Sequence, residues 1–303
     1  NTAVGNDALY ANTTGADNTA VGSLALDANT TGAGNTALGY GTLTTNTTAA
    51  YNTAVGYVSM RDNSTGADNV AVGFASLIVN TTGQGNTSVG FRSMYANTTA
   101  SRNTALGYEA LKANTTGANN TAIGSNALYE NTTGSYNVAL GANALEDVTT
   151  GTENIGIGES AGSGVTTGYE NICIGRGAGL GITTGVRNTI VGDDAYYLGS
   201  GSSNTIIGRF TGNYGGLDIR TSSNNIVLSD GAGTPVIHTV VSSTHVAGNI
   251  DVTQNLSSGN HITVASGATV NLFGSGNAFS GVFIINDFTS TGQVAMVMTG
   301  GGA

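Results

Sequence analysis

The chain has few charged residues, one proline, one cysteine and no tryptophan among its 303 residues. Charged side chains make up only 9% of it, and eight basic against eighteen acidic residues give a formal net charge of −10. Nucleic acids and anionic membranes require clustered basic residues, yet Lys112 is the only lysine. We therefore expect no nucleic acid partner. The lone Cys173 excludes an internal disulfide.

Catalytic and membrane-spanning signals are also missing. No run of eighteen apolar residues is present, so we expect no membrane insertion in this segment. The histidines His238, His245 and His261 do not share a metal-ligand spacing, and no paired carboxylates recur in register. We predict no catalytic, cofactor-binding or metal-binding residue, no cofactor and no enzymatic activity. Because the sequence opens at Asn1 inside a repeat, we expect it to be a piece of a longer polypeptide.

A 17-residue repeat dominates what is present. Asparagine recurs at every seventeenth position from Asn1 to Asn188, in twelve copies of N-T-A-V-G-x-x-A-L-x-x-N-T-T-G-x-x. Irregular copies begin at Asn204 and Asn225. We number the positions of each copy from 1 to 17, starting at this asparagine. Such a fixed period is typical of solenoid proteins, in which every repeat contacts its neighbours.

The pattern within one copy favours strands and turns. Position 5 is glycine from Gly5 to Gly208, which predicts a positive φ or a close backbone approach. Position 4 is a branched aliphatic residue, and position 9 is Leu or Met in the first nine copies. Two short strands joined by two turns, with about two large apolar core residues per coil, fit this pattern. The sequence therefore predicts an all-β chain, a parallel β-solenoid or β-roll whose twelve coils rise on the order of 55 Å.

Stacked coils place identical side chains above one another. Asparagine carries donors and acceptors, so asparagine columns at positions 1 and 12 can bond from coil to coil. The predicted ladder residues are Asn1, Asn18, Asn35, Asn52, Asn12 and Asn29, with Gly5, Gly22, Val4 and Val21. Eight N-T-T or N-S-T triplets, from Asn12 to Asn131, are also formal N-glycosylation sequons, which a eukaryotic secretory pathway would convert into a row of glycans.

The apolar pattern changes near residue 148. Position 9 becomes Gly162 and Gly179, while position 12 becomes Val148, Val165 and Ile182. Position 2 changes as well, to Val138, Ile155 and Ile172. Lost volume at position 9 thus returns at positions 12 and 2, so we expect these positions to share one packed region. Cys173 takes position 3, where Ala is usual, and is expected to be a buried small residue.

The N-T-A-V-G-x-x-A-L repeat resembles the repeats of trimeric adhesin heads, whose left-handed parallel β-rolls carry an N-S-V-A-I-G-x-x-S motif. It is also similar to repeats of phage tail fibres and other virion fibre proteins. The resemblance covers about residues 1–210, although here the distance from Asn to Gly is one residue shorter. It implies a homotrimeric fibre, and association would also enlarge the thin core of a single chain.

Four segments follow from the pattern. Residues 1–203 form the repeat shaft, 204–250 an irregular β transition region, 251–273 a narrow β-shaft, and 274–303 the start of a C-terminal β domain. In the last segment, apolar stretches flank Thr289 to Gly292, which predicts a β-hairpin.

Outward aromatic residues are the candidate contact surface. Position 6 carries Tyr40, Tyr57, Phe74, Phe91 and Tyr108. Two hypotheses are open: these rings stack on sugars or a protein surface, or they pack between protomers and thicken the core.

The sequence therefore favours an extracellular structural and receptor-binding protein, on a virion fibre or a cell surface. We expect a trimeric phage-type tail fibre that attaches to a host cell-surface glycan or protein. The alternatives are a bacterial trimeric adhesin and an ice-binding β-solenoid. The adjacent threonines at positions 13 and 14 weaken the ice-binding hypothesis, because neighbouring strand residues cannot both point outward.

Overall fold

The computed structural model describes residues 1–195, 199–214, 216–240, 243–246, 280–286 and 293–299. The chain divides into two compact units, Asn1–Val236 and Ile237–Ala303. Strands and turns account for the regular structure of these described residues, and they contain no helix. The predicted all-β class is confirmed.

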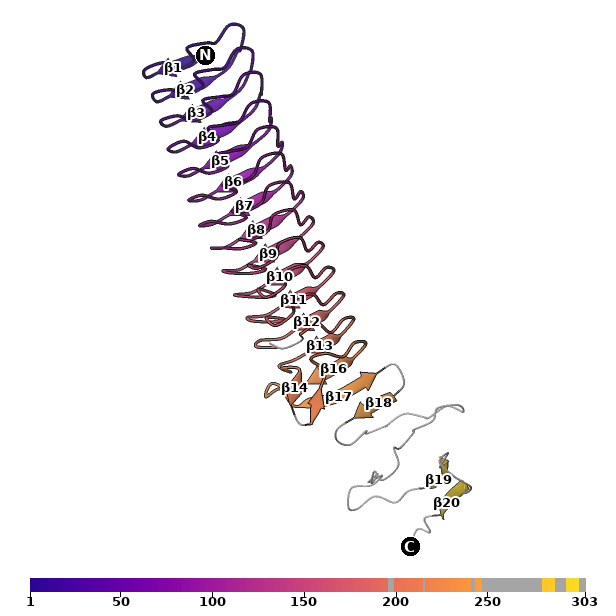
Figure 1. Cartoon of the computed structure of the whole chain (residues 1–303). Coiled ribbons are helices and arrows are strands. Elements are labelled where there is room, and N and C mark those ends of the chain that lie inside the picture. The colour runs from indigo at the N-terminus through magenta and orange to yellow at the C-terminus, as the bar shows by residue number, and fades with distance from the viewer. Residues whose placement is uncertain (196–198, 215, 241–242, 247–279, 287–292, 300–303) are drawn as a thin grey trace. The chain divides into compact units, whose positions relative to one another are not determined.

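The first unit is a parallel β-solenoid with coils of 17 residues (Figure 1). Each coil contributes one short strand that pairs in parallel with the equivalent strand of the next coil, so that Ala20 lies opposite Ala37. The strands are β1 (Thr2–Val4), β2 (Thr19–Val21), β3 (Thr36–Leu38), β4 (Thr53–Val55), β5 (Val70–Val72), β6 (Thr87–Val89), β7 (Thr104–Leu106), β8 (Thr121–Ile123), β9 (Val138–Leu140), β10 (Ile155–Ile157), β11 (Ile172–Ile174), β12 (Thr189–Val191), β13 (Thr205–Ile207) and β16 (Ile226–Ser229).

The expectation of two strands per coil is wrong, because each coil has one. Beyond position 5 the backbone turns, with left-handed φ angles at positions 7, 9 and 17, as at Glu109 (51°), Leu111 (52°) and Asn119 (59°). Alternating left-handed residues prevent an extended strand. Hydrogen bonds between coils continue nevertheless: the Leu111 amide donates to the Ala127 carbonyl at 2.9 Å.

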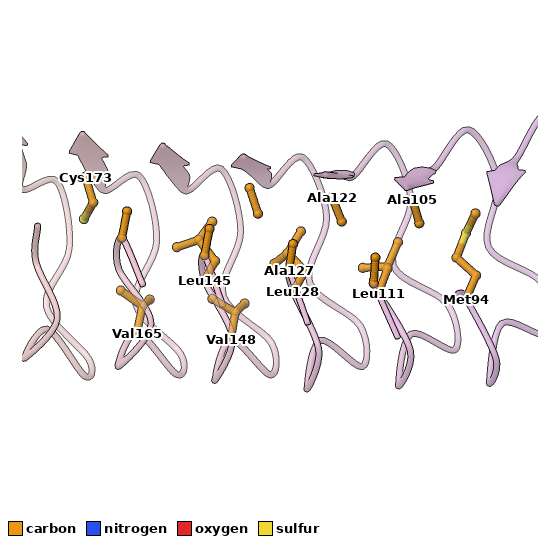
Figure 2. Packing of buried hydrophobic residues seen from close by; sticks show 14 of the residues in the cluster. Met94, Ala105, Leu111, Ala122, Ala127, Leu128, Leu145, Val148, Val165 and Cys173 are labelled. Carbon is orange, nitrogen blue, oxygen red and sulfur yellow. The ribbon is translucent and has the colours of Figure 1, made fainter. Parts of the chain in front are cut away.

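The core contains small residues from positions 3 and 8 and one large residue from position 9. Leu111, Leu128 and Leu145 are completely buried and stack along the solenoid (Figure 2). The expectation of two large apolar core residues per coil is wrong, because position 4 points outward. The coil interior is narrow at the strand, so only a small side chain such as Ala122 fits there.

The predicted change of packing near residue 148 is confirmed at position 12. Val148, Val165 and Ile182 are fully buried. The space beside Gly179 is filled by neighbouring side chains, since a Cβ there would lie 2.5 Å from the Cys173 sulfur and 3.1 Å from Ile182 Cδ1. Figure 2 shows Val148 and Val165 below the leucine column.

Position 2 does not take part in this exchange. Val138, Ile155 and Ile172 are only half-buried, and they begin strands whose middle residue faces the core. Residues at positions 2 and 3 point to opposite faces of a strand, so position 2 faces solvent. The expectation that position 2 shares the packed region is wrong.

The glycine column at position 5 has both predicted properties. Its φ angles lie between +108° and +155°. A Cβ on Gly90 would lie 2.1 Å from the carbonyl oxygen of Gly107, the next glycine in the column. No other residue satisfies both conditions.

The parallel sheet continues beyond residue 203 through β13 and β16, with a hairpin of β14 (Asn213–Tyr214) and β15 (Leu217–Asp218) between them. Two further antiparallel pairs follow: β17 (Pro235–Val240) with β18 (Ser243–Val246), and β19 (Ser280–Asn286) with β20 (Gln293–Thr299). The second pair confirms the predicted hairpin. The predicted shaft at 251–273 lies outside the described residues.

Candidate functional site: the outward strand face

The outward face of the solenoid consists of side chains at positions 2 and 4 of β1 to β13. In β7, Thr104 and Leu106 point to solvent, while Ala105 between them is buried. We call the residues at one repeat position of successive coils a column. Columns 2 and 4 therefore form a continuous surface along the sheet.

Column 4 is aliphatic in every coil and remains partly exposed. Leu38, Leu106 and Leu140 keep 47%, 46% and 45% of their surface accessible. Columns 2 and 4 contain only Thr, Val, Leu and Ile from Thr2 to Ile207. A charge-free surface of threonine and aliphatic side chains that extends over many strands is unusual for a face that stays in water.

Column 6 borders this face just past the glycine turn. The five aromatic residues predicted as contact residues, Tyr40, Tyr57, Phe74, Phe91 and Tyr108, form one continuous stack in five successive coils. Neighbouring ring centroids lie 5.2–5.6 Å apart, with interplanar angles of 4–15°. All five side chains are at least 38% exposed.

This geometry bears on the two hypotheses for the aromatic residues. The inner rings, Tyr57, Phe74 and Phe91, each stack on a ring on either side. A flat sugar therefore cannot insert between them, and the stack offers mainly ring edges to a partner. Ring edges and aliphatic neighbours suit packing against another apolar surface better than stacking on a sugar face.

Columns 2 and 6 both change in composition along the solenoid. Where column 6 is aromatic, column 2 is Thr in four of the five coils, with Val70 in the fifth. Where column 2 becomes Val138, Ile155 and Ile172, column 6 becomes Ala142, Glu159 and Arg176. The aromatic surface is therefore limited to the middle of the shaft.

The predicted asparagine ladder residues lie inside the solenoid from the second coil on, while Asn1 in the first coil is exposed and Asn12 is half-buried. In column 1, the Asn18 carboxamide oxygen accepts from the Asn35 amide at 2.9 Å, and its nitrogen donates to the Gly32 carbonyl at 2.8 Å. In column 12, Asn29 donates to the Asn12 side-chain oxygen at 2.8 Å. Asn1, Asn35 and Asn52 make the same bonds as Asn18. Each amide bonds along and across the column, so these residues are scaffold.

The other predicted ladder residues divide between backbone and surface. Gly5 and Gly22 form the turn column. Val4 and Val21 belong to column 4 on the outward face, and Val4, in the first coil, is 58% exposed.

The sequon asparagines are inaccessible in the folded chain. From Asn29 to Asn131 all are fully buried, and each side-chain nitrogen donates to a carbonyl three residues on, as Asn63 does to Gly66 at 2.9 Å. A glycan on that nitrogen would break the ladder. The folded solenoid therefore excludes N-glycosylation at these positions.

Two buried titratable groups of the described residues, Asp194 and Cys173, have structural surroundings. Asp194 is buried and pairs with Arg176 and Arg209, at 2.8 Å each. Burial raises the pKa of the Cys173 thiol to about 12, as expected for a packed side chain rather than a nucleophile. Within the described part of the chain, no three His, Cys, Asp or Glu residues lie close enough together to hold a metal ion.

Sequence reasoning missed that column 4 is a surface. The signal was present in position 3, which is small in eleven of the first twelve copies and lies between two larger outward residues. In a three-residue strand with a narrow interior, the middle residue faces the core. Reading the small residue as the inward one would have placed Val4 and its equivalents outside.

No helix in the described residues is long and apolar enough to cross a membrane. Comparisons with protein-family models, with curated proteins and with solved structures gave no match to this chain.

Proposed function

We propose that this chain is the shaft and distal part of an extracellular homotrimeric fibre that attaches to a cell-surface glycan or protein, and that it has no catalytic role. The observation that carries the proposal is the charge-free outward face, which extends over thirteen coils. An isolated monomer gains nothing from such a face. Burial between copies would remove it from water at roughly 25 cal/mol for each Å² of apolar surface.

The ladders support a shaft role. Column 1 and column 12 asparagines connect each coil to the next, and Thr hydroxyls at position 13 donate to the carbonyl of the following coil, as from Thr98 to Thr115 at 3.2 Å. These repeated bonds connect successive coils into one continuous element, which is what a spacer needs. We place recognition on the irregular C-terminal part, because the shaft repeats the same scaffold residues in its asparagine and glycine columns from coil to coil.

Two measurements on the whole chain test the proposal. Light scattering should give three times the 30.0 kDa chain mass. A labelled trimer should bind a glycan array or a panel of bacterial cells saturably, and heat-denatured protein should not. A monomer in solution would overturn the oligomeric part, and absence of saturable binding across both panels would overturn the attachment part.

Within the proposed class of trimeric fibres, we propose a phage-type tail fibre, and a cell-surface trimeric adhesin is the alternative. The gene neighbourhood distinguishes the tail fibre from the adhesin. Baseplate genes next to this one would favour a tail fibre, whereas an outer-membrane anchor in the same gene would favour an adhesin.

Ice binding is a second candidate, supported by one observation. Columns 2 and 4 place threonine beside a branched aliphatic residue on one flat face, as Thr121 and Ile123 do in β8. Thermal hysteresis of the purified chain tests this function. Freezing-point depression beyond the colligative value would favour it, and a normal ice-crystal habit would exclude it.

A further inference from the structure

The contact between the eighth coil (residues 120–136) and the ninth coil (residues 137–153) is incomplete on one side. Three buried side-chain polar atoms of the described residues lack a hydrogen-bond partner, and two of them lie in the eighth coil. These two are the side-chain oxygens of Asn126, in column 7, and Asn131, in column 12. The equivalent of Asn131 in the ninth coil is Val148, which has no side-chain donor. An unpaired buried acceptor weakens the structure around it.

Column 7 is weakly bonded at the same boundary. The Asn126 side-chain nitrogen donates to the Asn143 side-chain oxygen over 3.4 Å, whereas ordinary N–H···O bonds span about 2.7–3.2 Å. Other boundaries hold column 7 by charge: Arg92 of the sixth coil pairs with Glu109 of the seventh, at 3.9 Å. The eighth and ninth coils have only the long amide contact there.

Three carboxylates lie on this side of the boundary as well. Glu130 and Asp147 occupy column 11 of the two neighbouring coils, and Glu146 lies beside them in column 10. Among the described residues, none of the three forms an ion pair. Burial, together with repulsion from Asp147 and Glu130, raises the pKa of Glu146. Like charges that face one another across neighbouring strands or coils oppose their pairing.

The strand side of this boundary is intact. β8 and β9 pair in parallel, with Ala122 opposite its equivalent in β9. In column 1, the Asn120 side-chain oxygen accepts from the Asn137 backbone amide at 2.9 Å and from its side-chain nitrogen at 3.3 Å. Ala122 and Val148 lie on opposite sides of the core (Figure 2). The two coils are therefore held firmly along the strand and weakly on the far side of the core.

We infer that the shaft has a built-in joint between its eighth and ninth coils, which opens on the side of columns 7 to 12 while β8 and β9 stay paired as the hinge. The backbone amides of Leu128 and Glu130 donate across this side, each at 3.0 Å, to Ala144 and Glu146. Opening breaks these bonds and leaves the strand bonds in place. The joint gives the shaft one fixed place at which it bends. It is a property of the single chain and does not depend on the number of copies.

Hydrogen exchange on the whole chain, followed residue by residue with mass spectrometry, tests the joint. Met94 and Ala96 are the equivalents of Leu128 and Glu130 in the sixth coil, and their amides donate to the next coil in the same way. After correction for intrinsic rates, Leu128 and Glu130 should exchange at least about fivefold faster than these two. Thr121, at the start of β8, should remain as protected as the sixth coil.

Val148→Asn should move the joint by one coil. The new side chain supplies the donor that Asn131 lacks, so exchange at the eighth-coil amides should slow. The unpaired oxygen then belongs to residue 148, and fast exchange should appear at the ninth-coil amides of Leu145 and Asp147, which donate to the tenth coil.

Glu146→Gln provides a second test that leaves the buried column 12 unchanged. Removal of this charge relieves the repulsion at the boundary, so exchange at Leu128 and Glu130 should slow. The matched control is Glu153→Gln, which removes an exposed carboxylate of the same coil outside the cluster and should leave both rates unchanged.

Equal exchange rates in the sixth and eighth coils would overturn the joint, and so would fast exchange that stays at Leu128 and Glu130 in Val148→Asn. If that variant does not fold, Glu146→Gln decides: slower exchange at both amides supports the joint, and unchanged rates contradict it. A monomeric chain or a loss of receptor binding would overturn the function proposed above and would leave this inference standing.

Discussion

Each asparagine in column 12 from Asn29 to Asn114 donates two side-chain hydrogen bonds and accepts one. Asn97 donates to the Asn80 side chain and to the Ala100 carbonyl, and accepts from Asn114. The column ends at Asn131, because the next residue in it is Val148, which has no donor. The Asn131 side-chain oxygen is buried without a partner. An unpaired buried acceptor costs about 1–3 kcal/mol, so the two ends of one ladder differ in energy.

Asn97→Val should lower the thermal midpoint more than Asn131→Val. The first change leaves the Asn80 oxygen unpaired inside an intact ladder, at a cost of about 1–3 kcal/mol. The second moves the existing unpaired oxygen from Asn131 to Asn114 and extends the valine column, so it should be nearly neutral. Melting curves from circular dichroism measure both variants. Equal losses would show that the ladder end carries no such penalty.

Cys173 should be unreactive in the folded chain. Its thiol is buried and its pKa is raised to about 12, so almost no thiolate exists at pH 8. A thiol-specific disulfide reagent should label the protein only after denaturation, whereas a variant with Thr150→Cys, at an exposed position outside the outward strand face, should take up one equivalent at once in the native state. Rapid native labelling of Cys173 itself would mean that the coil opens readily.

At the scale of the coil, glycine has two different roles. Glycines of column 5 combine a positive φ with a neighbouring backbone at contact distance. Gly41, at position 7, also has a positive φ, but its nearest neighbours are the ends of side chains. Other coils place Val58 or Glu109 at position 7 with similar angles. Position 7 therefore tolerates a side chain and position 5 does not.

Gly90→Ala should destabilise the solenoid by more than about 3 kcal/mol, because the added methyl group would overlap the Gly107 carbonyl in a strained backbone conformation. Gly41→Ala is the matched control, with an expected cost of about 1 kcal/mol. Denaturant unfolding followed by circular dichroism compares the two. A similar midpoint for both variants would mean that the coils separate enough to admit a methyl group.

Three features of the coil could be predicted from the sequence: its period, its glycine turn and its asparagine columns. They were visible because glycine and asparagine recur at the same positions of successive copies. The direction of side chains within the strand could not be predicted. Val4 and Ala3 are both apolar, and a three-residue strand is too short for alternation to be visible. The left-handed leucines were also unpredictable, since residues such as Leu111 disfavour that conformation and adopt it only because burial offsets the strain. For the same reason the coil was expected to hold a second strand.

At the scale of the whole molecule, little of the scaffold titrates. Columns 1, 12 and 13 consist almost entirely of neutral Asn, Thr and Val side chains. Two carboxyl groups have lowered pKa values and two have raised pKa values. Hydrogen bonds from Arg220 lower the pKa of Asp218 to about 2, and backbone hydrogen bonds lower that of Asp230. Loss of hydration on burial raises the pKa of Glu146 and Asp147.

The thermal midpoint should therefore change little between pH 7 and about pH 4. Asp218 and Asp230 stabilise the fold above their ordinary pKa, and this contribution is lost as the pH falls through their lowered values. Glu146 and Asp147 have the opposite sign: their contribution is present at low pH and is lost as the pH rises through their raised values. Melting curves at half-unit pH steps measure the balance. A steep fall of the midpoint between pH 7 and pH 5 would contradict it.

The coils from β2 to β8 make the same column 1 hydrogen bonds to their neighbours. The gene can therefore gain or lose whole coils without creating a new type of contact between successive coils. Deleting residues 69–85 would join Asp68 to Asn86, which replaces one asparagine at position 1 with another. Recombination between the repeats would then yield shafts of different reach with unchanged ends. The length of the shaft can therefore change by inheritance in steps of one coil. Exchanges of this kind join equivalent coils on the same side of the change from asparagine to valine in column 12.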